Sequence, residues 1–334
     1  MKRNMNFKEE IIKLKEELDV TIVAHFYQKD EVFEMGDITG DSLELAKRAM
    51  SAPNDTIIFC GVGFMGQSVK VLSPNKRVLM PRIACCAMAK MIDVDYFETN
   101  LKILNEAGIS NDDILPITYI NSSAEVKAAV GKMGGYVCTS SNAFAIITKG
   151  LESGKKIFFV PDRCLGQNFA NQMKLKSAVI GIDDIEDVKS SDIICYNGFC
   201  SVHQLFTPDD IDFYREKFPD ILVAVHPECD VKVVDKADFV GSTSQLIKYI
   251  TQEISPEQKV VVGTEYNMVN RLRDKNTYVL SQTKPECPTM NETTLEDLYN
   301  TLLSVKEGRF DNEIQISDDV AKYAKIALDK MFEV

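Results

Sequence analysis

Several features that would direct the chain to a membrane, to nucleic acid or to export are missing from its sequence. No stretch reaches the about 18 consecutive apolar residues that a membrane-spanning helix needs. Lys and Arg number 38 against 50 Asp and Glu, a net charge of −12, which argues against the basic face that nonspecific nucleic-acid binding requires. Residues 1–18 show the pattern of a charged amphipathic helix and lack the apolar stretch of a signal peptide. We expect a cytoplasmic protein with neither a nucleic-acid nor a membrane partner.

The chain also lacks the features of a small disulfide-stabilised protein. It has 334 residues, of which 45% are hydrophobic, so a sizeable core is available and two or three domains are expected. The nine cysteines are odd in number. Without an export signal the compartment is expected to be reducing, and disulfides are not expected.

Short β-branched runs alternate with helical patterns along the chain. The strand candidates are Thr21–Ala24, Thr56–Phe59, Ile157–Val160, Ile221–Val225 and Lys259–Val262. This alternation favours parallel sheets covered by helices on both faces.

The alternation repeats three times. The first copy reads TIVAHFYQ, MGDITGDSLELAKRA and TIIFCGV; the second reads LPITYINSS, GGYVCTSSNAFAIITKGL and KIFFVPD; the third reads ILVAVHPEC, KADFVGSTSQLIKYI and KVVVGTE. Twelve positions separate His25 from Asp37, and twelve also separate His226 from Asp238. We predict α/β units at residues 1–105, 106–190 and 191–290, each a parallel sheet flanked by helices in three layers, and a C-terminal helical segment, 291–334, that packs back on them.

Each copy places two polar residues, two positions apart, at the end of its first strand. These pairs are His25 and Tyr27, Tyr119 and Asn121, and His226 and Glu228. Ligands of open α/β sheets bind beyond the carboxyl ends of the strands, and residues two apart share a face there. The chain has three histidines in all, so two of them at equivalent repeat positions favour a functional interpretation. The alternative is a histidine that only satisfies local structure.

Each copy then opens a helix with small hydroxyl residues. They are Ser42 in the first copy, Ser140 and Ser141 in the second, and Ser242 and Thr243 in the third. Free backbone N–H groups at helix N-termini bind carboxylates or phosphate even in an acidic protein. The alternative is that these hydroxyls are simple helix caps.

One cysteine follows the last strand of each copy. Cys86 lies in PRIACCAMA, Cys200 in NGFCSVH and Cys287 in PECPTM. Three thiolates from three units can hold three irons of a cubane cluster and leave the fourth iron open as a Lewis acid.

The other cysteines divide into core candidates and ambiguous ones. Cys60, Cys138 and Cys195 lie in apolar runs typical of core strands. Cys85 could be the ligand in place of Cys86, Cys229 could border the site, and Cys164 is ambiguous. Cys200 and His203 form C-x-x-H, half of a zinc site, and no second pair completes it, so zinc is the minor option.

The order and number of motifs resemble the quinolinate synthase family. The matching stretches are AHFYQ, GDSLELAK, FMGQSVKVLSP, CAMA, YINSSAEVKA, CTSSNA, FVPDRCLG, GFCSVH, HPEC, VGSTSQ, GTE and CPTM, and they run from about Val20 to about Leu302. The resemblance implies three α/β domains related by pseudo-threefold symmetry, with the active site at their common interface. It also implies one oxygen-sensitive 4Fe–4S cluster per chain, held by Cys86, Cys200 and Cys287 with one iron open.

The reaction implied by the resemblance is the condensation of iminoaspartate with dihydroxyacetone phosphate to quinolinate, phosphate and water in de novo NAD biosynthesis. An aspartate oxidase or dehydrogenase that makes iminoaspartate would be the functional neighbour. The candidates for proton transfer are Tyr27, Tyr119, His226 and Glu228. The candidates for substrate binding are His25, Ser42, Tyr119, Asn121, Ser140, Ser242 and Thr243.

The sequence also departs from the family pattern. Gly66 to Val69 replace a segment that usually reads A-E-T-A, and Asn270 stands where a histidine is expected. The stretches 98–113 and 175–191 resemble insertions. Two other classes stay open: an iron–sulfur hydro-lyase acting on hydroxy acids, and a three-domain ligand-binding protein whose cysteines are core residues.

Overall fold

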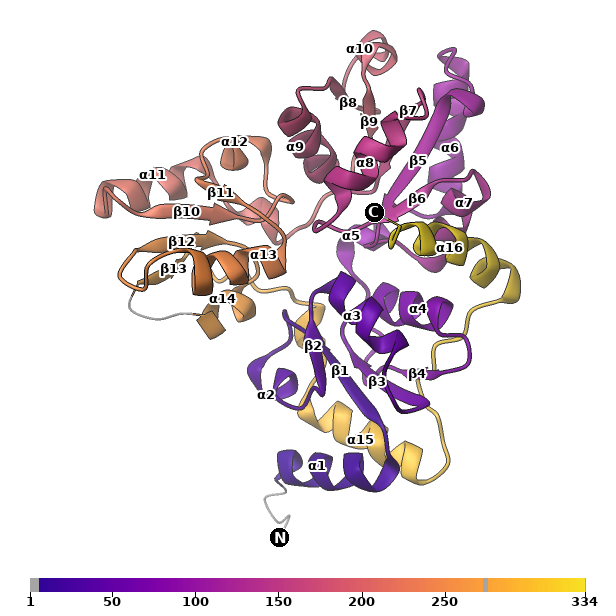
Figure 1. Ribbon diagram of the computed structural model, residues 1–334, viewed down its shortest axis with the longest axis vertical. Coiled ribbons are helices and arrows are strands. Elements are labelled where there is room, and N and C mark those ends of the chain that lie inside the picture. The colour runs from indigo at the N-terminus through magenta and orange to yellow at the C-terminus, as the bar shows by residue number, and fades with distance from the viewer. Residues whose placement is uncertain (1–5, 273–275, 334) are drawn as a thin grey trace. The chain divides into compact units, whose positions relative to one another are not determined.

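The computed structural model describes residues 6–272 and 276–333. Its strands form three parallel sheets, each flanked by helices, which confirms the predicted α/β class (Figure 1). The chain divides into two compact units: the first runs to Cys86 and includes Cys287–Ser317, and the second comprises Ala87–Glu286 and the segment from Asp318 onward. The boundaries predicted at 105/106, 190/191 and 290/291 stay a prediction.

The first unit contains a four-stranded sheet in the order β2-β1-β3-β4. Its strands are β1 (Thr21–His25), β2 (Ile38–Gly40), β3 (Thr56–Cys60) and β4 (Arg77–Leu79), and all neighbours are parallel. Its helices are α1 (Phe7–Leu18), α2 (Asp30–Phe33), α3 (Ser42–Met50), α4 (Gly63–Leu72) and α15 (Leu295–Lys306). The two central strands are the β-branched runs that the sequence predicts.

The second unit contains two sheets. One has five parallel strands in the order β6-β5-β7-β9-β8. The strands are β5 (Ile114–Tyr119), β6 (Tyr136–Cys138), β7 (Lys156–Val160), β8 (Ser177–Val179) and β9 (Ile193–Cys195). The accompanying helices are α5 (Ala87–Lys90), α6 (Val94–Glu106), α7 (Ala124–Lys132), α8 (Ala143–Leu151), α9 (Arg163–Met173), α10 (Ile185–Ser190) and α16 (Asp318–Lys330).

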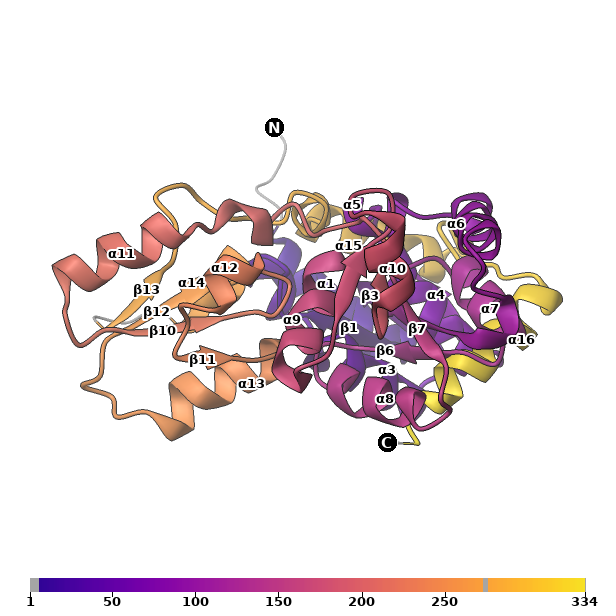
Figure 2. The same ribbon diagram turned by 90° about the horizontal axis from the view of Figure 1, so that it is seen from above.

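The other sheet of this unit has four parallel strands in the order β11-β10-β12-β13. The strands are β10 (Leu222–Val225), β11 (Phe239–Val240), β12 (Val260–Gly263) and β13 (Thr277–Val279). The helices are α11 (Pro208–Lys217), α12 (Val231–Val234), α13 (Thr243–Lys248) and α14 (Tyr266–Leu272). Ile211 of α11 and Val233 of α12 pack into the core with Val223 and Val261, while α13 lies on the opposite side of the sheet (Figure 2).

The three sheets share one strand order, which supports the internal repeat. In each sheet the first strand lies between the second and the third, and a fourth strand follows the third. The five-stranded sheet has β8 as an additional strand at its edge. The stretch 175–191, which resembles an insertion in the sequence, forms β8 and α10.

The equal spacing of the first and third copies has a structural cause. The Asp37 carboxylate accepts a hydrogen bond from the backbone N–H of Ile22 at 2.9 Å, and Asp238 accepts one from Val223 at 2.8 Å. Each aspartate therefore extends the pairing between the first and second strands of its sheet by one residue. His25, the last residue of β1, and His226, the residue after β10, lie at the same distance from these aspartates in the chain.

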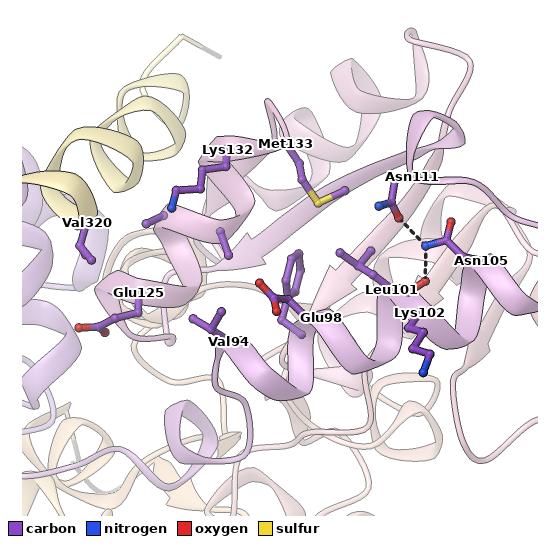
Figure 3. A pocket seen from close by; sticks show the side chains of 13 residues that line it. Val94, Glu98, Leu101, Lys102, Asn105, Asn111, Glu125, Lys132, Met133 and Val320 are labelled. Atoms are coloured by element: carbon purple, nitrogen blue, oxygen red, sulfur yellow. Dashed lines mark hydrogen bonds between the residues drawn. The ribbon is translucent and has the colours of Figure 1, made fainter.

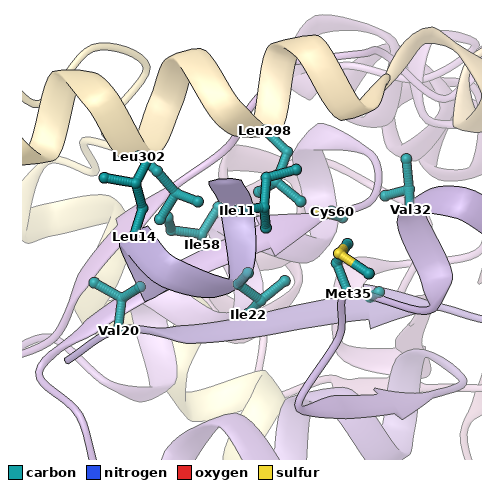
Figure 4. Packing of buried hydrophobic residues seen from close by; sticks show 11 residues of the cluster. Ile11, Leu14, Val20, Ile22, Val32, Met35, Ile58, Cys60, Leu298 and Leu302 are labelled. Atoms are coloured by element: carbon teal, nitrogen blue, oxygen red, sulfur yellow. The ribbon is translucent and has the colours of Figure 1, made fainter. Parts of the chain in front are cut away.

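Two segments far apart in the sequence build the core of the first unit. Ile11 and Leu14 of α1 and Leu298 and Leu302 of α15 are buried with Ile22 in one cluster (Figure 4). This burial confirms the predicted N-terminal amphipathic helix over Phe7–Leu18; residues 1–5 lie outside the described residues.

In the second unit α16 packs closely along α7. A methyl group placed on Gly131 of α7 would lie 2.0 Å from the backbone oxygen of Tyr323 in α16. Glycine therefore lets the two helix backbones approach each other. Lys330 adds a hydrogen bond from its ammonium group to the Gly134 carbonyl at 2.6 Å. Within residues 6–272 and 276–333, every helix is too short or too polar to cross a bilayer.

We predict that Gly131→Ala lowers the free energy of unfolding by about 1–3 kcal/mol, because the new methyl group meets a backbone atom that cannot move without shifting α16. Thermal unfolding would measure the effect. Gly134→Ala is the matched control, because no atom lies within 4 Å of a methyl group there. Any loss of stability in this variant comes from the left-handed φ of +72°, which alanine adopts less readily than glycine. Equal stability of Gly131→Ala and the wild type would contradict the close helix packing.

Candidate active site

In the second unit, residues from the ends of two sheets meet at a buried carboxylate. The Tyr119 hydroxyl, at the end of β5, donates a hydrogen bond to Glu228 Oε1 at 2.6 Å. Glu228 lies in the loop after β10 and is 4% exposed. The structure therefore brings together two predicted site residues from different copies, 109 positions apart in the chain.

His226 connects the same loop to the turn before α8. Its Nδ1 accepts the backbone N–H of Glu228 at 3.3 Å, and its Nε2 lies 3.2 Å from the Ser140 hydroxyl. Because Nδ1 accepts, the neutral ring carries its proton on Nε2 and donates it to Ser140. The Ser140 hydroxyl is thereby oriented with its own proton directed away from the ring.

His203 is a site residue that the sequence interpretation missed, having treated it only as part of a C-x-x-H pair. It lies in the short helical turn His203–Leu205 and is 1% exposed. Its Nδ1 is 3.0 Å from Glu228 Oε2, its Nε2 is 3.1 Å from the Thr264 hydroxyl, and its ring stacks on His226 at 4.7 Å between centroids. Glu228 therefore has Tyr119 on one carboxylate oxygen and His203 on the other.

Two opposing effects set the charge of Glu228. Burial alone disfavours the ionised carboxylate, but the adjacent His203 and His226 rings and the hydrogen bond from Tyr119 outweigh burial. The pKa of Glu228 is held below its usual range. The carboxylate is therefore an ionised hydrogen-bond acceptor inside the protein.

Two buried side chains fix the loops that carry these residues. Asn168 of α9 donates hydrogen bonds from its amide nitrogen to the carbonyls of Pro227 and Cys229, both at 2.8 Å. These bonds fix the backbone on either side of Glu228. Lys127 of α7 is fully buried and donates to the carbonyl of Ile120 at 2.7 Å and to that of Ser122. The loop that follows Tyr119 and carries Asn121 is thus tied to α7.

Asp162 is a second buried carboxyl close enough to Glu228 to interact with its charge. It caps α9 by accepting the backbone N–H groups of Cys164 at 2.8 Å and Leu165 at 3.3 Å. Burial raises the pKa of Asp162 well above its usual value, and the charge of Glu228 raises it further. Asp162 is therefore a weaker acid than a surface aspartate, and the charges of the two carboxyl groups oppose each other.

A cavity of about 530 Å³ opens beside this network. Ser140, Ser141, Asn168 and Pro227 line it together with residues of α8, α9, α12 and α13. Nearby, the buried oxygen of the Asn121 amide has no hydrogen-bond partner among the described residues. Both features suit a small polar ligand at the strand ends.

The helix-opening hydroxyls differ in what they do. Ser242 caps α13 and accepts the backbone N–H of Gln245, while Thr243 is the first residue of that helix. The cap of α3 is Asp41 rather than Ser42, and the cap of α8 is Asn142 rather than Ser140 or Ser141. The interpretation of Ser42, Ser141 and Thr243 as helix caps is therefore wrong, because neighbouring residues occupy the capping positions.

The first unit holds the predicted site residues His25, Tyr27 and Ser42. His25 ends β1, and its Nδ1 accepts the backbone N–H of Tyr27 at 3.1 Å, the same local contact that His226 makes with Glu228. The rings of His25 and Tyr27 meet edge to face at 4.8 Å between centroids. Ser42 begins α3.

Exposure divides the nine cysteines into three groups. Cys60, Cys138, Cys164, Cys195 and Cys229 are buried. Burial raises the pKa of the Cys60 thiol to about 12 and is the main cause of a similar rise for Cys164. Cys86, Cys200 and Cys287 are partly exposed and lie in the loops after β4, β9 and β13, whereas Cys85 is exposed. The three predicted ligands are the partly exposed ones.

A second groove, of about 590 Å³, lies between α6 and α7 (Figure 3). Leu101 and Met133 contribute apolar surface, and Glu98, Lys102 and Lys132 stand around it. The groove contains none of the predicted site residues.

A family model described as "Quinolinate synthetase A protein" matches residues 9–333. Over 338 residues and the full length of both chains, the sequence is 53% identical to the quinolinate synthase of Helicobacter pylori. It is 39% identical to the quinolinate synthase of Streptomyces coelicolor over 332 residues, 93% of this chain and 84% of the relative. The chain belongs to the quinolinate synthase family. The resemblance seen in the sequence is thereby confirmed.

Two residues at which this quinolinate synthase family member departs from the family pattern make specific contacts with nearby side chains. A methyl group at Gly66, where alanine is usual, would lie 2.6 Å from the Met80 sulfur, so the glycine accommodates Met80. Asn270 accepts a hydrogen bond from the Tyr266 hydroxyl at 3.1 Å within α14.

We predict that Lys127→Met lowers both stability and turnover. Methionine is unbranched like lysine and ends one atom short of its nitrogen, so it donates no hydrogen bond. Each carbonyl left without a donor costs roughly 1–3 kcal/mol. The loosened loop after Tyr119 is expected to reduce kcat by up to about 100-fold, since small misplacements of reacting groups have such effects. Thermal unfolding and steady-state kinetics would measure the two effects.

The matched control is Lys132→Met on the same helix, where the exposed ammonium group pairs with Asp319 at 3.1 Å. Its stability is expected to change by less than about 0.5 kcal/mol. If the two variants behave alike, Lys127 does not hold the site loop.

Proposed function

We propose that the chain is a quinolinate synthase that condenses iminoaspartate with dihydroxyacetone phosphate to form quinolinate, phosphate and water in de novo NAD biosynthesis. The observation that carries the proposal is the buried Tyr119–Glu228–His203 network at the strand ends, in a chain whose family match covers residues 9–333. An aspartate oxidase or dehydrogenase would supply iminoaspartate. An oxygen-sensitive cofactor calls for a reducing compartment, so we propose a cytoplasmic location.

Cys86, Cys200 and Cys287 are proposed to hold one 4Fe–4S cluster with one iron open. They fit this role because thiolate ligands need access, and these three thiols are partly exposed while five others are buried. The bound cluster would supply an open iron that polarises a substrate hydroxyl or carboxylate.

Glu228 is proposed as the base of the condensation. Its pKa lies below the usual range, so the carboxylate is ionised and would accept a proton from a substrate group whose own acidity is raised by its bound partners. Tyr119 donates to its Oε1 and would pass a proton between the carboxylate and the substrate. His226 and Tyr27 are the further candidates for proton transfer.

The hydroxyls and amides around the strand ends are proposed to orient the substrates. His226 holds the Ser140 hydroxyl at 3.2 Å, so that Ser140 can donate its proton to a substrate carboxylate beside the 530 Å³ cavity. The Asn121 amide oxygen is buried without a partner among the described residues and suits a substrate N–H or hydroxyl. His25, Ser42, Ser242 and Thr243 complete the proposed set that binds carboxylates and phosphate.

The first test measures iron, sulfide and quinolinate formation after anaerobic purification. The wild type is expected to carry about four irons per chain and to form quinolinate from iminoaspartate and dihydroxyacetone phosphate. Cys200→Ala is expected to stay folded but to lose both the cluster and the activity.

Cys85→Ala is the control, since it removes the exposed thiol beside Cys86 and should leave iron and activity unchanged. Full iron content in Cys200→Ala would remove Cys200 from the ligand set. Dehydration of hydroxy acids without quinolinate formation would favour a hydro-lyase, and colourless protein would favour a binding protein.

A second test addresses Tyr119. Tyr119→Phe removes the hydrogen bond to Glu228 Oε1 and is expected to lower kcat by roughly 10²–10⁴-fold while the iron content stays the same. Tyr214→Phe is the matched control, because the Tyr214 hydroxyl donates to the Val279 carbonyl at 3.0 Å and has no proposed part in the reaction. Unchanged kcat in Tyr119→Phe would exclude Tyr119 from proton transfer.

A further inference from the structure

Three side chains of the second unit offer a sulfur, a nitrogen and an oxygen to one point. The Cys200 thiol, a His203 ring nitrogen and a Glu228 carboxylate oxygen all lie within 4.8 Å of one another. Cys200 and His203 come from the segment after β9, and Glu228 comes from the loop after β10. His203 and Glu228 are buried, and Cys200 is partly exposed, so the group has one accessible side.

We propose that these three residues form a binding site for a single divalent transition metal ion of the Zn²⁺ type, occupied when the chain carries no iron–sulfur cluster. Cys200 Sγ, His203 Nδ1 and Glu228 Oε2 are the ligands, and water or a small anion takes the fourth position. On binding, the Cys200 thiol gives up its proton to solvent. The thiolate and the carboxylate then balance the two charges of the ion.

The contacts of His203 favour a cation at this point. Its Nε2 lies 3.1 Å from the Thr264 hydroxyl, which orients the ring. Its Nδ1 is 3.0 Å from Glu228 Oε2, yet the approach is not aligned as a hydrogen bond, so Nδ1 has no hydrogen-bond partner among the described residues. A metal ion bound by both atoms would supply the positive charge that the buried Glu228 carboxylate needs beside it.

The surroundings match the outer shell of a metal site. Metal-binding histidines generally donate their other N–H to an oxygen, and metal-binding carboxylates accept further hydrogen bonds. Thr264 stands at the second nitrogen of His203, and the Tyr119 hydroxyl donates to the second oxygen of Glu228 at 2.6 Å. Both buried ligands are therefore held in place before any ion arrives.

One consequence rests on the proposed function. Cys200 cannot bind a cluster iron and the single ion at once, and an ion on Glu228 would also block the proposed base. The two metal centres exclude each other, so Zn²⁺ would hold the cluster-free chain inactive and oppose cluster insertion.

The test uses the full-length chain after the cluster has been removed and the thiols reduced. Co²⁺ is titrated without oxygen as an optical probe of this Zn²⁺-type site. One Co²⁺ per chain is expected to bind with thiolate-to-cobalt charge-transfer absorption and visible bands of four-coordinate Co²⁺, and Zn²⁺ should displace it. Cys200→Ser, His203→Gln and Glu228→Gln are each expected to weaken binding by at least about 10-fold, since even outer-shell changes have effects of this size.

Cys86→Ser and Cys287→Ser separate this site from the cluster. Both should lose the cluster yet bind Co²⁺ like the wild type, and thermal unfolding would verify that every variant is folded. The proposal is overturned if Cys200→Ser keeps the charge-transfer absorption, or if Cys86→Ser and Cys287→Ser weaken Co²⁺ binding as much as Cys200→Ser does. A failed quinolinate assay would refute the proposed function and leave these absorption results unaffected.

Discussion

The site in the second unit depends on a single buried negative charge. An ionised carboxylate inside a protein is tolerated only when hydrogen bonds and cations replace the water it has lost. Glu228 receives a hydrogen bond from Tyr119 and lies against His203, while burial and the charge of Glu228 raise the pKa of the neighbouring Asp162. Removing any of these partners would change the charge state of the site as well as its shape.

That charge also explains why so much buried polar structure surrounds the strand ends. The loop of Glu228 is held by the Asn168 amide, and the loop after Tyr119 is held by the Lys127 ammonium group. Both side chains bind backbone carbonyls rather than other side chains, so they fix the path of the chain. A carboxylate whose environment must supply several hydrogen bonds at once needs loops of this rigidity.

The sequence predicts the parts of the fold that local patterns determine. The β-branched runs at 21–24 and 157–160 are buried on both faces, as central strands are. The spacing of His25 from Asp37 reflects the hydrogen bond from the Ile22 N–H to the Asp37 carboxylate. Cys86, Cys200 and Cys287 are the partly exposed cysteines, and their choice as cluster ligands stays a prediction. These features depend on residues close together in the chain or on their place after a strand.

The missed residues depend on contacts between distant segments. His203 meets Glu228 across 25 positions and Asn168 reaches Pro227 across 59, and neither contact leaves a pattern in the chain. The spacing C-x-x-H was the one local signal for His203. The sequence leaves open that hydroxyl residues cap α3 and α8, but Asp41 and Asn142, which stand beside them and suit the same position, are the N-cap residues.

The division of the C-terminal segment between the two units bears on how the chain is synthesised. Leu298 and Leu302 of α15 complete the core around Ile11 and Leu14, although almost the whole polypeptide separates them. As the ribosome releases the chain from its N-terminus, α1 and the first sheet emerge long before the helix that covers them. The apolar face of the first unit therefore stays exposed to solvent through most of translation. A truncated product that ends before α15 would keep this face exposed and would be a target for chaperones and proteases.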